Sequence, residues 1–406
     1  MVLKINKIII VLLLLLGQNV LGFLGISLNL FQAGILTLGI IPLFYFRKSL
    51  YQIKSLTALF LFVSVFASYK LLSDRGEGIR QLSLTIIGAP IVIAAMSGPV
   101  LYRNKKYLHF WKSVLVIIIY AFLLETGLSI FERLIGHNVF GWQGEEGVMA
   151  FSVNEQGTTD FRSTAIYGHP LSNVLMVSTA MVFLLVSKLK ITLKLLLWVM
   201  GFLSILCFNS RSGIVGNFLF LVVFLIHALF LNRHMNSSLK VKLFLGVFVA
   251  FIVGYLLVFN YGLGGRLLEM GLFDEKSSQV RFNAWDIFAY YDIEHFLFAH
   301  SLEENMALRY SAGLYRLENF WLDYMLSCGL IFLLVYSFLY FFVFKYFLRN
   351  YSLFSKCFVS FAFISIASTS NSLDSNFLFL FYFILLSIVN DPFVFEKIVD
   401  EKYRSN

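Results

Sequence analysis

Apolar segments of about 20 residues follow one another along almost the whole chain, and this repetition constrains the fold more than any other feature. The hydrocarbon core of a bilayer is about 30 Å thick, so a helix needs about 20 apolar residues to cross it. Of the 406 residues, 59% are hydrophobic and only 14% are charged, whereas a soluble domain carries about 25% charged residues. The sequence therefore predicts an all-α, polytopic transmembrane bundle that forms a single integral membrane domain over residues 1–406.

Twelve apolar segments are bounded by polar or basic residues. They lie at about 8–24, 28–46, 55–72, 82–100, 110–130, 166–187, 192–208, 213–231, 243–260, 319–344, 354–371 and 376–390. The first segment follows Lys4 and Lys7 and has the character of a signal peptide, but no small-x-small cleavage site comes after it. An uncleaved first span is the better interpretation.

The basic residues divide between the two sides of the predicted bundle as the positive-inside rule requires. With the N-terminus inside, 21 of the 32 Lys and Arg residues fall in inner loops, and every inner loop contains some of them. Only four of the 23 acidic residues fall inside, so the net charge of +9 reflects topology and does not indicate nucleic-acid binding. This division predicts twelve spans with both termini in the cytoplasm.

The two kinds of basic residue are also distributed unequally. Sixteen of the 21 inner residues are Lys, whereas nine of the eleven outer residues are Arg. A membrane topology needs only positive charge, but the planar guanidinium suits bidentate binding of phosphate or carboxylate. Any single outer Arg could instead pair with one of the outer acids. As a group they indicate an anionic ligand on the outer face.

Two outer loops are long, at about 131–165 and 261–318, and long loops are usually functional. The first ends near Arg162 and leads to His169 and Pro170. The second contains Arg281, a row of aromatic residues at helical spacing that includes Trp285, and a further arginine, Arg316. The aromatic row predicts an interfacial helix, which either packs on the bundle or lies along the membrane surface.

Two span starts carry polar residues that have both a structural and a functional explanation. Arg211 lies in the tip Asn209–Ser212, where an arginine can extend to the interface, or, if the tip is buried, needs an anion. Glu318 and Asn319 open the tenth span. A glutamate there is favoured by the helix dipole, but it is also placed to take a proton from an acceptor hydroxyl.

Several kinds of site have no sequence signature in this chain. There is no Gly-rich phosphate loop, no HExxH, no GxSxG and no Asp-x-Asp clamp for a metal nucleotide. The three cysteines, Cys207, Cys328 and Cys357, lie in apolar stretches without metal-ligand spacing. We therefore expect no metal and no cofactor.

The chain resembles the superfamily of O-antigen polymerases and O-antigen ligases of bacterial envelopes. Four local matches occur in the expected order: Arg162 with Gly168-His169-Pro170, Ser210-Arg211-Ser212-Gly213, Arg281-x-x-x-Trp285, and Glu318-Asn319 followed by Gly329-Leu330. Together with the twelve-span layout, the resemblance covers most of the chain.

The resemblance implies a GT-C-like, metal-independent glycosyltransferase whose donor is a glycan on undecaprenyl diphosphate. It implies that Arg211 and Arg281 hold the diphosphate, where developing negative charge gains most from fixed cations. Glu318 is the third catalytic candidate. The residues expected to contact the headgroup or the acceptor are Arg162, His169, Trp285, Asn319 and Arg316.

One departure from the superfamily pattern favours a polymerase. The ligases typically have His before the Asn at this span start, whereas this chain has Glu318. The resemblance thus implies polymerisation of lipid-linked repeat units of O-antigen, capsule or exopolysaccharide at the outer face of the bacterial inner membrane. Both donor and acceptor would be lipid-linked. A chain-length-regulating co-polymerase is left open as a protein partner.

Two alternatives remain. One is an O-antigen ligase that transfers the glycan to lipid A core. The other is a flippase or another transporter, which would be expected to place ionisable groups near the membrane midplane and to interrupt its spans. Glu125 and Asp323 instead lie near the outer ends of their predicted spans.

Overall fold

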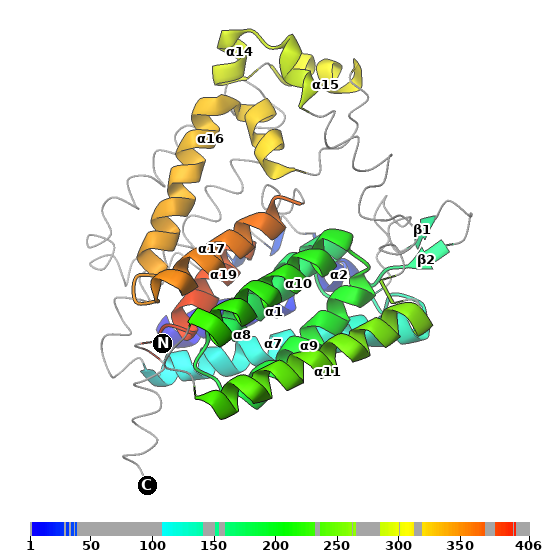
Figure 1. Cartoon of the computed structure of the whole chain (residues 1–406). Helices are drawn as coiled ribbons and strands as arrows, with labels where there is room; N and C mark the ends of the chain where they lie inside the picture. The colour runs from blue at the N-terminus through cyan, green and yellow to red at the C-terminus, as the bar shows by residue number, and fades with distance from the viewer. Residues whose placement is uncertain are drawn as a thin grey trace.

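The computed structural model describes residues 2–27, scattered positions between 30 and 38, 108–140, 151–153, 159–231, 236–261, 263–264, 285–299, 301–311, 319–369, 378–392 and 394. The main helices of this part are α1 (Val2–Leu15), α2 (Gln18–Phe23), α7 (Leu108–Ile135), α8 (Pro170–Val186), α9 (Ile191–Phe208), α10 (Arg211–Ile226), α11 (Ser237–Tyr261), α14 (Ile293–Phe298), α15 (Leu302–Ser311), α16 (Phe320–Phe347), α17 (Leu353–Ala367) and α19 (Leu378–Val389), shown in Figure 1. A short antiparallel pair, β1 (Phe151–Val153) with β2 (Thr159–Phe161), lies between α7 and α8. The predicted helical membrane fold is thus confirmed in its class.

Eight of the twelve predicted apolar segments, from 110–130 to 376–390, fall on described helices. Of these, 213–231 continues from α10 into a short π-helix, and 319–344 falls on α16, which is broken within the segment. The segments 55–72 and 82–100 lie outside the described residues, as does most of 28–46. The number twelve and the cytoplasmic placement of the termini therefore stay predictions. Among the described residues, four helices are long and apolar enough to cross a membrane: His109–Ile135, Ile191–Phe208, Arg211–Leu231 and Phe320–Phe347.

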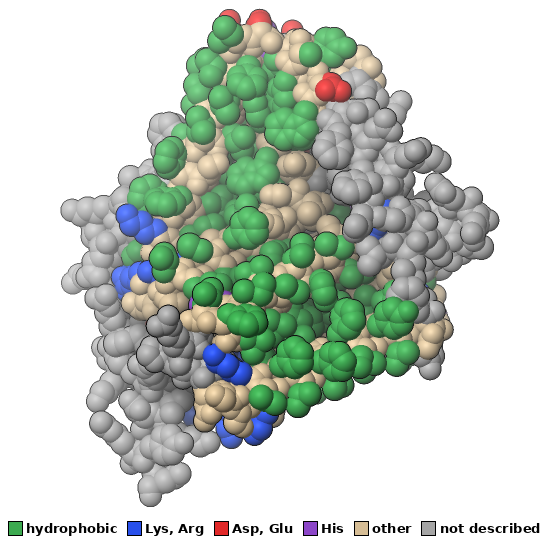
Figure 2. All heavy atoms as spheres, viewed as in Figure 1, with side chains coloured by type: hydrophobic (Ala, Val, Ile, Leu, Met, Phe, Trp, Pro, Cys, Tyr) green, Lys and Arg blue, Asp and Glu red, His purple; other side chains and the backbone are tan. Residues whose placement is uncertain are grey.

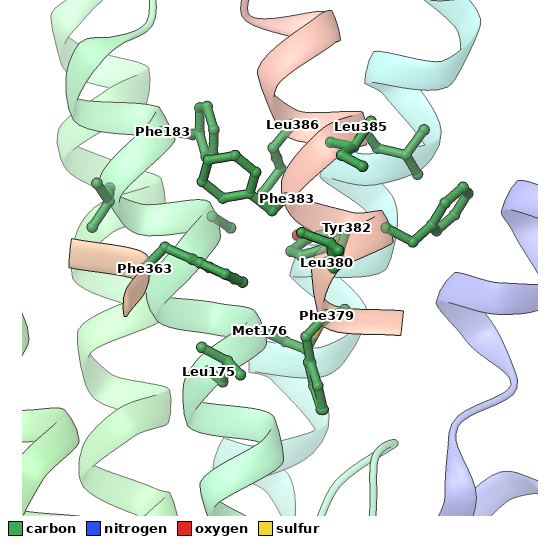
Figure 3. Close-up of a cluster of buried hydrophobic side chains, with 14 of the residues drawn as sticks. Leu175, Met176, Phe183, Phe363, Phe379, Leu380, Tyr382, Phe383, Leu385 and Leu386 are labelled. Carbon is green, nitrogen blue, oxygen red and sulfur yellow. The ribbon is translucent and has the colours of Figure 1, made fainter. Parts of the chain in front are cut away.

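The core of the bundle is built around α8 and α19. Every residue of α19 is buried, although this helix has only 12 residues. Figure 3 shows its aromatic side chains meeting those of α8 and α17: the ring of Phe383 lies 5.3 Å from Phe183 and 4.7 Å from Phe363. A helix that is apolar all round is suited to such a central position.

The outer surface of the bundle is also strongly apolar. Along α11, the side chains of Phe244, Phe248, Phe251 and Tyr255 are all more than half exposed. Figure 2 shows hydrophobic side chains covering most of the visible face of the described helices. Water would not solvate a surface of this extent, so its natural environment is lipid.

Charged residues separate along the helices. The lysines in the described part of the chain occupy one end, which we call the lysine end: Lys4, Lys7, Lys112, Lys188, Lys190, Lys194, Lys240, Lys242, Lys345 and Lys356. The opposite ends of the same helices meet at what we call the arginine end, around Arg133, Arg162 and Arg211. Figure 2 shows basic side chains mostly at the lower left and acidic ones at the top. The described part therefore keeps the separation of Lys from Arg that the sequence predicted.

The first predicted span is not one continuous helix. Helix α1 ends at Leu15 and α2 begins at Gln18. The intervening Gly17 packs so closely on the backbone of Ile166 that a Cβ atom would lie 2.4 Å from its carbonyl oxygen. The break therefore coincides with a tertiary contact that only a glycine allows.

The tenth predicted span, 319–344, folds back on itself. Gly329 has φ 85° and ψ 169°, which breaks α16 into a short limb before it and a long limb after it. The limbs lie side by side, because the ring of Tyr324 is 4.7 Å from that of Tyr336 and the ring of Trp321 is 6.4 Å from that of Tyr340. We call this element the α16 hairpin, and Figure 1 shows its tip beneath α14 and α15.

The aromatic row of the second long loop does not form one continuous helix in its described part. A 3-10 helix covers Asp286–Tyr290, the chain is extended at Tyr291, and α14 begins at Ile293. Phe288 and Tyr291 pack on Ile287, Leu322 and Leu326, so this part of the row contacts the short limb of the α16 hairpin. Packing on the bundle is thus the observed arrangement.

Candidate functional site at the arginine end

The end of α7 holds the segment that follows β2. Arg133 donates a hydrogen bond to the carbonyl of Phe161, one residue before Arg162. The carboxylate of Glu132 accepts hydrogen bonds from the hydroxyl of Ser163 and from the backbone N–H of Thr164 and of Ala165, the last two at 3.0 Å. The end of α7 therefore holds positions 161, 163, 164 and 165, on both sides of Arg162. We call residues 161–169, up to the start of α8, the 161–169 segment.

Two buried amides hold the same segment from its other side. The side chain of Asn19 in α2 donates to the hydroxyl of Thr164 at 2.9 Å and to the carbonyl of Ala165 at 2.8 Å. The side chain of Asn173 in α8 donates to the carbonyl of Thr164 at 2.6 Å. Ala165 has φ 36°, a conformation that a side-chain-bearing residue adopts only when its surroundings impose it.

The 161–169 segment brings two predicted site residues to the bundle end. The guanidinium Nε of Arg162 donates to the carbonyl of Phe208, the last residue of α9, at 3.2 Å. His169 is the N-cap of α8, where its Nδ1 accepts the N–H of Leu171 at 3.2 Å. Pro170 follows as the first helical residue, a position that its fixed φ favours.

Arg211 opens α10 directly beside this segment. Asn209 turns the chain with φ 52°, and Ser210 caps the helix by accepting the N–H of Gly213. A Cβ on Gly213 would lie 2.6 Å from Val174, so the first turns of α10 and α8 are in close contact. Asn209 and Ser210 are buried and Arg211 is partly buried. The predicted tip is therefore drawn into the bundle.

The start of α16 lies at the same end of the bundle, because it contacts the residues that follow α17. The hydroxyl of Ser212 donates to Thr369 at 3.2 Å, and the indole N–H of Trp321 donates to the neighbouring Ser368 at 2.7 Å. Asn319 caps α16 by accepting the N–H of Trp321 at 3.0 Å. The N-termini of α8, α10 and α16 thus meet near Arg162 and Arg211. Helix N-termini carry partial positive charge, but the C-termini of α7, α9 and α17 lie at the same end and carry the opposite sign. The fixed positive charge that suits an anion here therefore comes from the arginines.

An apolar groove of about 590 Å³ runs between α9, α10 and α11. Its lining is aliphatic and aromatic and includes Trp198, Phe218 and Phe251. Ile214 also lines it and lies one helical turn from Arg211. The groove therefore reaches to within about one turn, or about 5 Å, of the arginine end.

The predicted site residues are only partly brought together. Arg162, His169, Arg211 and Asn319 lie at the arginine end, as described above. Trp285 is 52% exposed and packs beside Phe288, in the part of the chain that covers the α16 hairpin. The predicted residues that lie outside the described part are Arg281, Arg316 and Glu318.

Several residues that shape this end are not among those predicted for it. Glu125 and Glu132 are seven residues apart and hold the 161–169 segment from one face of α7. Glu125 lies inside the predicted span 110–130, and an ionisable residue inside a membrane span is a sequence signal for a functional position. Glu132 lies just beyond that span and carries no such signal. Asn19 carries a weaker signal, a single amide in an apolar run.

No group of three or more metal-ligating side chains occurs among the described residues. Comparison with protein-family models and with curated proteins finds no match to the chain. The site at the arginine end is therefore interpreted from its own chemistry.

Proposed function

We propose that the chain is a membrane-embedded, metal-independent glycosyltransferase that polymerises oligosaccharide repeat units carried on undecaprenyl diphosphate. The product would be O-antigen, capsule or another exopolysaccharide, made at the outer face of the bacterial inner membrane. In this proposal the lysine end faces the cytoplasm and the arginine end faces outward, as the positive-inside rule favours.

One observation carries the proposal. Arg162 and Arg211 lie with the N-termini of α8 and α10 at one end of an apolar groove. Cations and helix N-termini bind phosphate, and an aliphatic and aromatic groove suits a hydrocarbon chain. The pair of features fits an amphiphile whose anionic headgroup is attached to a long hydrocarbon chain.

The proposed reaction is glycosyl transfer from the lipid-linked diphosphate to a hydroxyl of the acceptor. A hydroxyl of the acceptor sugar attacks the anomeric carbon of the donor, forming the new glycosidic bond. The bond between that carbon and the diphosphate oxygen breaks, and the diphosphate leaves with the electron pair. Arg211, with Arg281 from the second long loop, would neutralise the leaving charge. The proton of the attacking hydroxyl would pass to Glu318 or to water.

A second function is favoured by a separate observation. The break of α16 at Gly329 gives an interrupted apolar helix with two limbs, a feature that many transporters use at their substrate sites. The lipid-linked glycan would then be moved across the membrane and not extended. Transfer of the glycan to lipid A core by a ligase of the same superfamily is the third possibility.

Reconstitution into liposomes separates the three functions. Purified protein is given lipid-linked repeat units without lipid A core, and the products are resolved by size. A ladder of longer lipid-linked glycans supports the polymerase. If product forms only when lipid A core is added, the protein is the ligase and not the polymerase. Transfer of unextended lipid-linked units between leaflets, with no new glycosidic bond, would replace it with the transporter.

A further inference from the structure

Glu132 is a buried carboxylate that the proposed reaction does not use, and its surroundings are unusual. The side chain has no exposed surface. One oxygen accepts the three donors of Ser163, Thr164 and Ala165, and the other accepts the N–H of Val139 at 3.0 Å. All four partners are donors, which matches the acceptor-only chemistry of a carboxylate.

We propose that Glu132 is a positioning residue for Arg162: it fixes the 161–169 segment so that the guanidinium is delivered to the α9–α10 turn. The role of Arg162 in this inference rests on the proposed function. The hydrogen bonding of Glu132 to the backbone can be measured separately.

Glu132 is coupled to Arg162 through the adjacent residue, Ser163. Ser163 is bound by Glu132 through its hydroxyl, while its backbone N–H donates to the carbonyl of Cys207 at 3.2 Å. The preceding residue, Arg162, donates to the next carbonyl of α9, that of Phe208. The carboxylate therefore fixes the residue beside Arg162 against the helix end that the arginine contacts.

Backbone strain in the segment supports the same role. Ala165 holds φ 36°, and both its N–H and its carbonyl are bound by buried side chains, Glu132 and Asn19 respectively. Strain of this kind persists only where the surroundings impose it. If the carboxylate of Glu132 were replaced by a weaker hydrogen-bond acceptor, the segment would therefore relax. Arg162 would then lose its fixed position.

Glu125 offers a matched control on the same face of α7. It is also buried, but it accepts only one hydrogen bond, from the N–H of Ile166 at 3.1 Å, and its second oxygen has no hydrogen-bond partner. In Glu125→Gln the amide oxygen can keep the bond to Ile166. In Glu132→Gln the neutral amide weakens three bonds and its NH₂ group faces the N–H of Val139.

The first experiment is hydrogen exchange on the full-length protein in nanodiscs. We expect Glu132→Gln to accelerate exchange of the Thr164 and Ala165 amides by about tenfold, because bonds to a charged acceptor become bonds to a neutral one. Glu125→Gln should leave both amides unchanged. Unchanged exchange of both amides in Glu132→Gln would overturn the proposal. Glu132→Ala is a poorer choice, since it leaves three buried donors unpaired and could fail to fold.

The second experiment measures the dissociation constant for undecaprenyl diphosphate without sugar. Glu132→Gln should weaken binding about tenfold in the wild-type background and should add nothing to Arg162→Ala. A penalty of equal size in both backgrounds, or none in either, would show that Glu132 does not act through Arg162. If the lipid binds as expected but no ladder forms from lipid-linked repeat units, the polymerase assignment fails while the positioning role stands.

Discussion

The bend of α16 at Gly329 is open to a direct test by Gly329→Ala. The glycine has φ 85° and ψ 169°. This backbone region is nearly exclusive to glycine and costs a side-chain-bearing residue about 1–3 kcal/mol. A Cβ atom would also lie 2.2 Å from the carbonyl oxygen of Leu297, closer than any real contact. The substitution must therefore push α14 away from the tip of the hairpin.

We expect Gly329→Ala to destabilise the protein by about 3 kcal/mol or more, the upper part of the strain range with the clash added. The measurement is thermal unfolding in detergent, followed by tryptophan fluorescence. Gly127→Ala is the matched control, because Gly127 lies within α7 and a Cβ there would meet nothing within 4 Å. Alanine favours helix over glycine by about 1 kcal/mol, so the control should unfold at the same or a higher temperature.

A cross-link distinguishes the hairpin from a straight helix. The rings of Tyr324 and Tyr336 are 4.7 Å apart in the hairpin. Twelve residues of unbroken helix would separate them by about 18 Å. Cysteines at these two positions, in a variant with the native Cys207, Cys328 and Cys357 replaced by Ala, should react with one short bismaleimide. Absence of the cross-link, together with wild-type stability of Gly329→Ala, would refute the folded-back α16.

The ion pair between Arg309 and Asp323, at 2.9 Å and largely shielded from solvent, should make Asp323→Asn destabilising by about 1–3 kcal/mol in thermal unfolding, because a partly buried cation loses its negatively charged partner. Asp292→Asn removes the carboxylate of an exposed pair and should change stability little; equal effects would contradict the buried role of Asp323. Val222→Trp, which fills the apolar groove, should weaken binding of undecaprenyl diphosphate in a lipid-binding assay, whereas Val249→Trp on the exposed face of α11 should not. Unchanged binding in Val222→Trp would show that the lipid chain does not bind in the groove.

Hydrophobic length and charge sidedness predict much of the helical layout. Segments such as 110–130 and 192–208 coincide with α7 and α9, because a span is determined by its own composition. The two breaks in the helices could not be predicted in this way. Gly17 and Gly329 lie within the predicted apolar segments, and at each of them a distant backbone approaches so closely that only glycine fits.

Site residues that belong to a local sequence motif are predictable from the sequence. Site residues that are brought in only by tertiary packing are not. Arg162, Arg211 and Asn319 were expected from local patterns, and the structure places them at one end of the bundle. Glu132 and Asn19 act by hydrogen bonding to a segment that lies far away in sequence: Ser163 is 31 residues from Glu132, and Thr164 is 145 residues from Asn19. Such partners depend on the tertiary fold, which one sequence does not reveal.

The most direct test of the central proposal is chain extension by wild-type protein and Arg211→Ala in liposomes that contain lipid-linked repeat units. Arg349→Ala is the control, because Arg349 lies at the opposite end, over the ring of Tyr346. We predict a glycan ladder from the wild type and from the control, and none from Arg211→Ala inserted at the same level. A full ladder from Arg211→Ala would contradict the placement of the diphosphate at the arginine end.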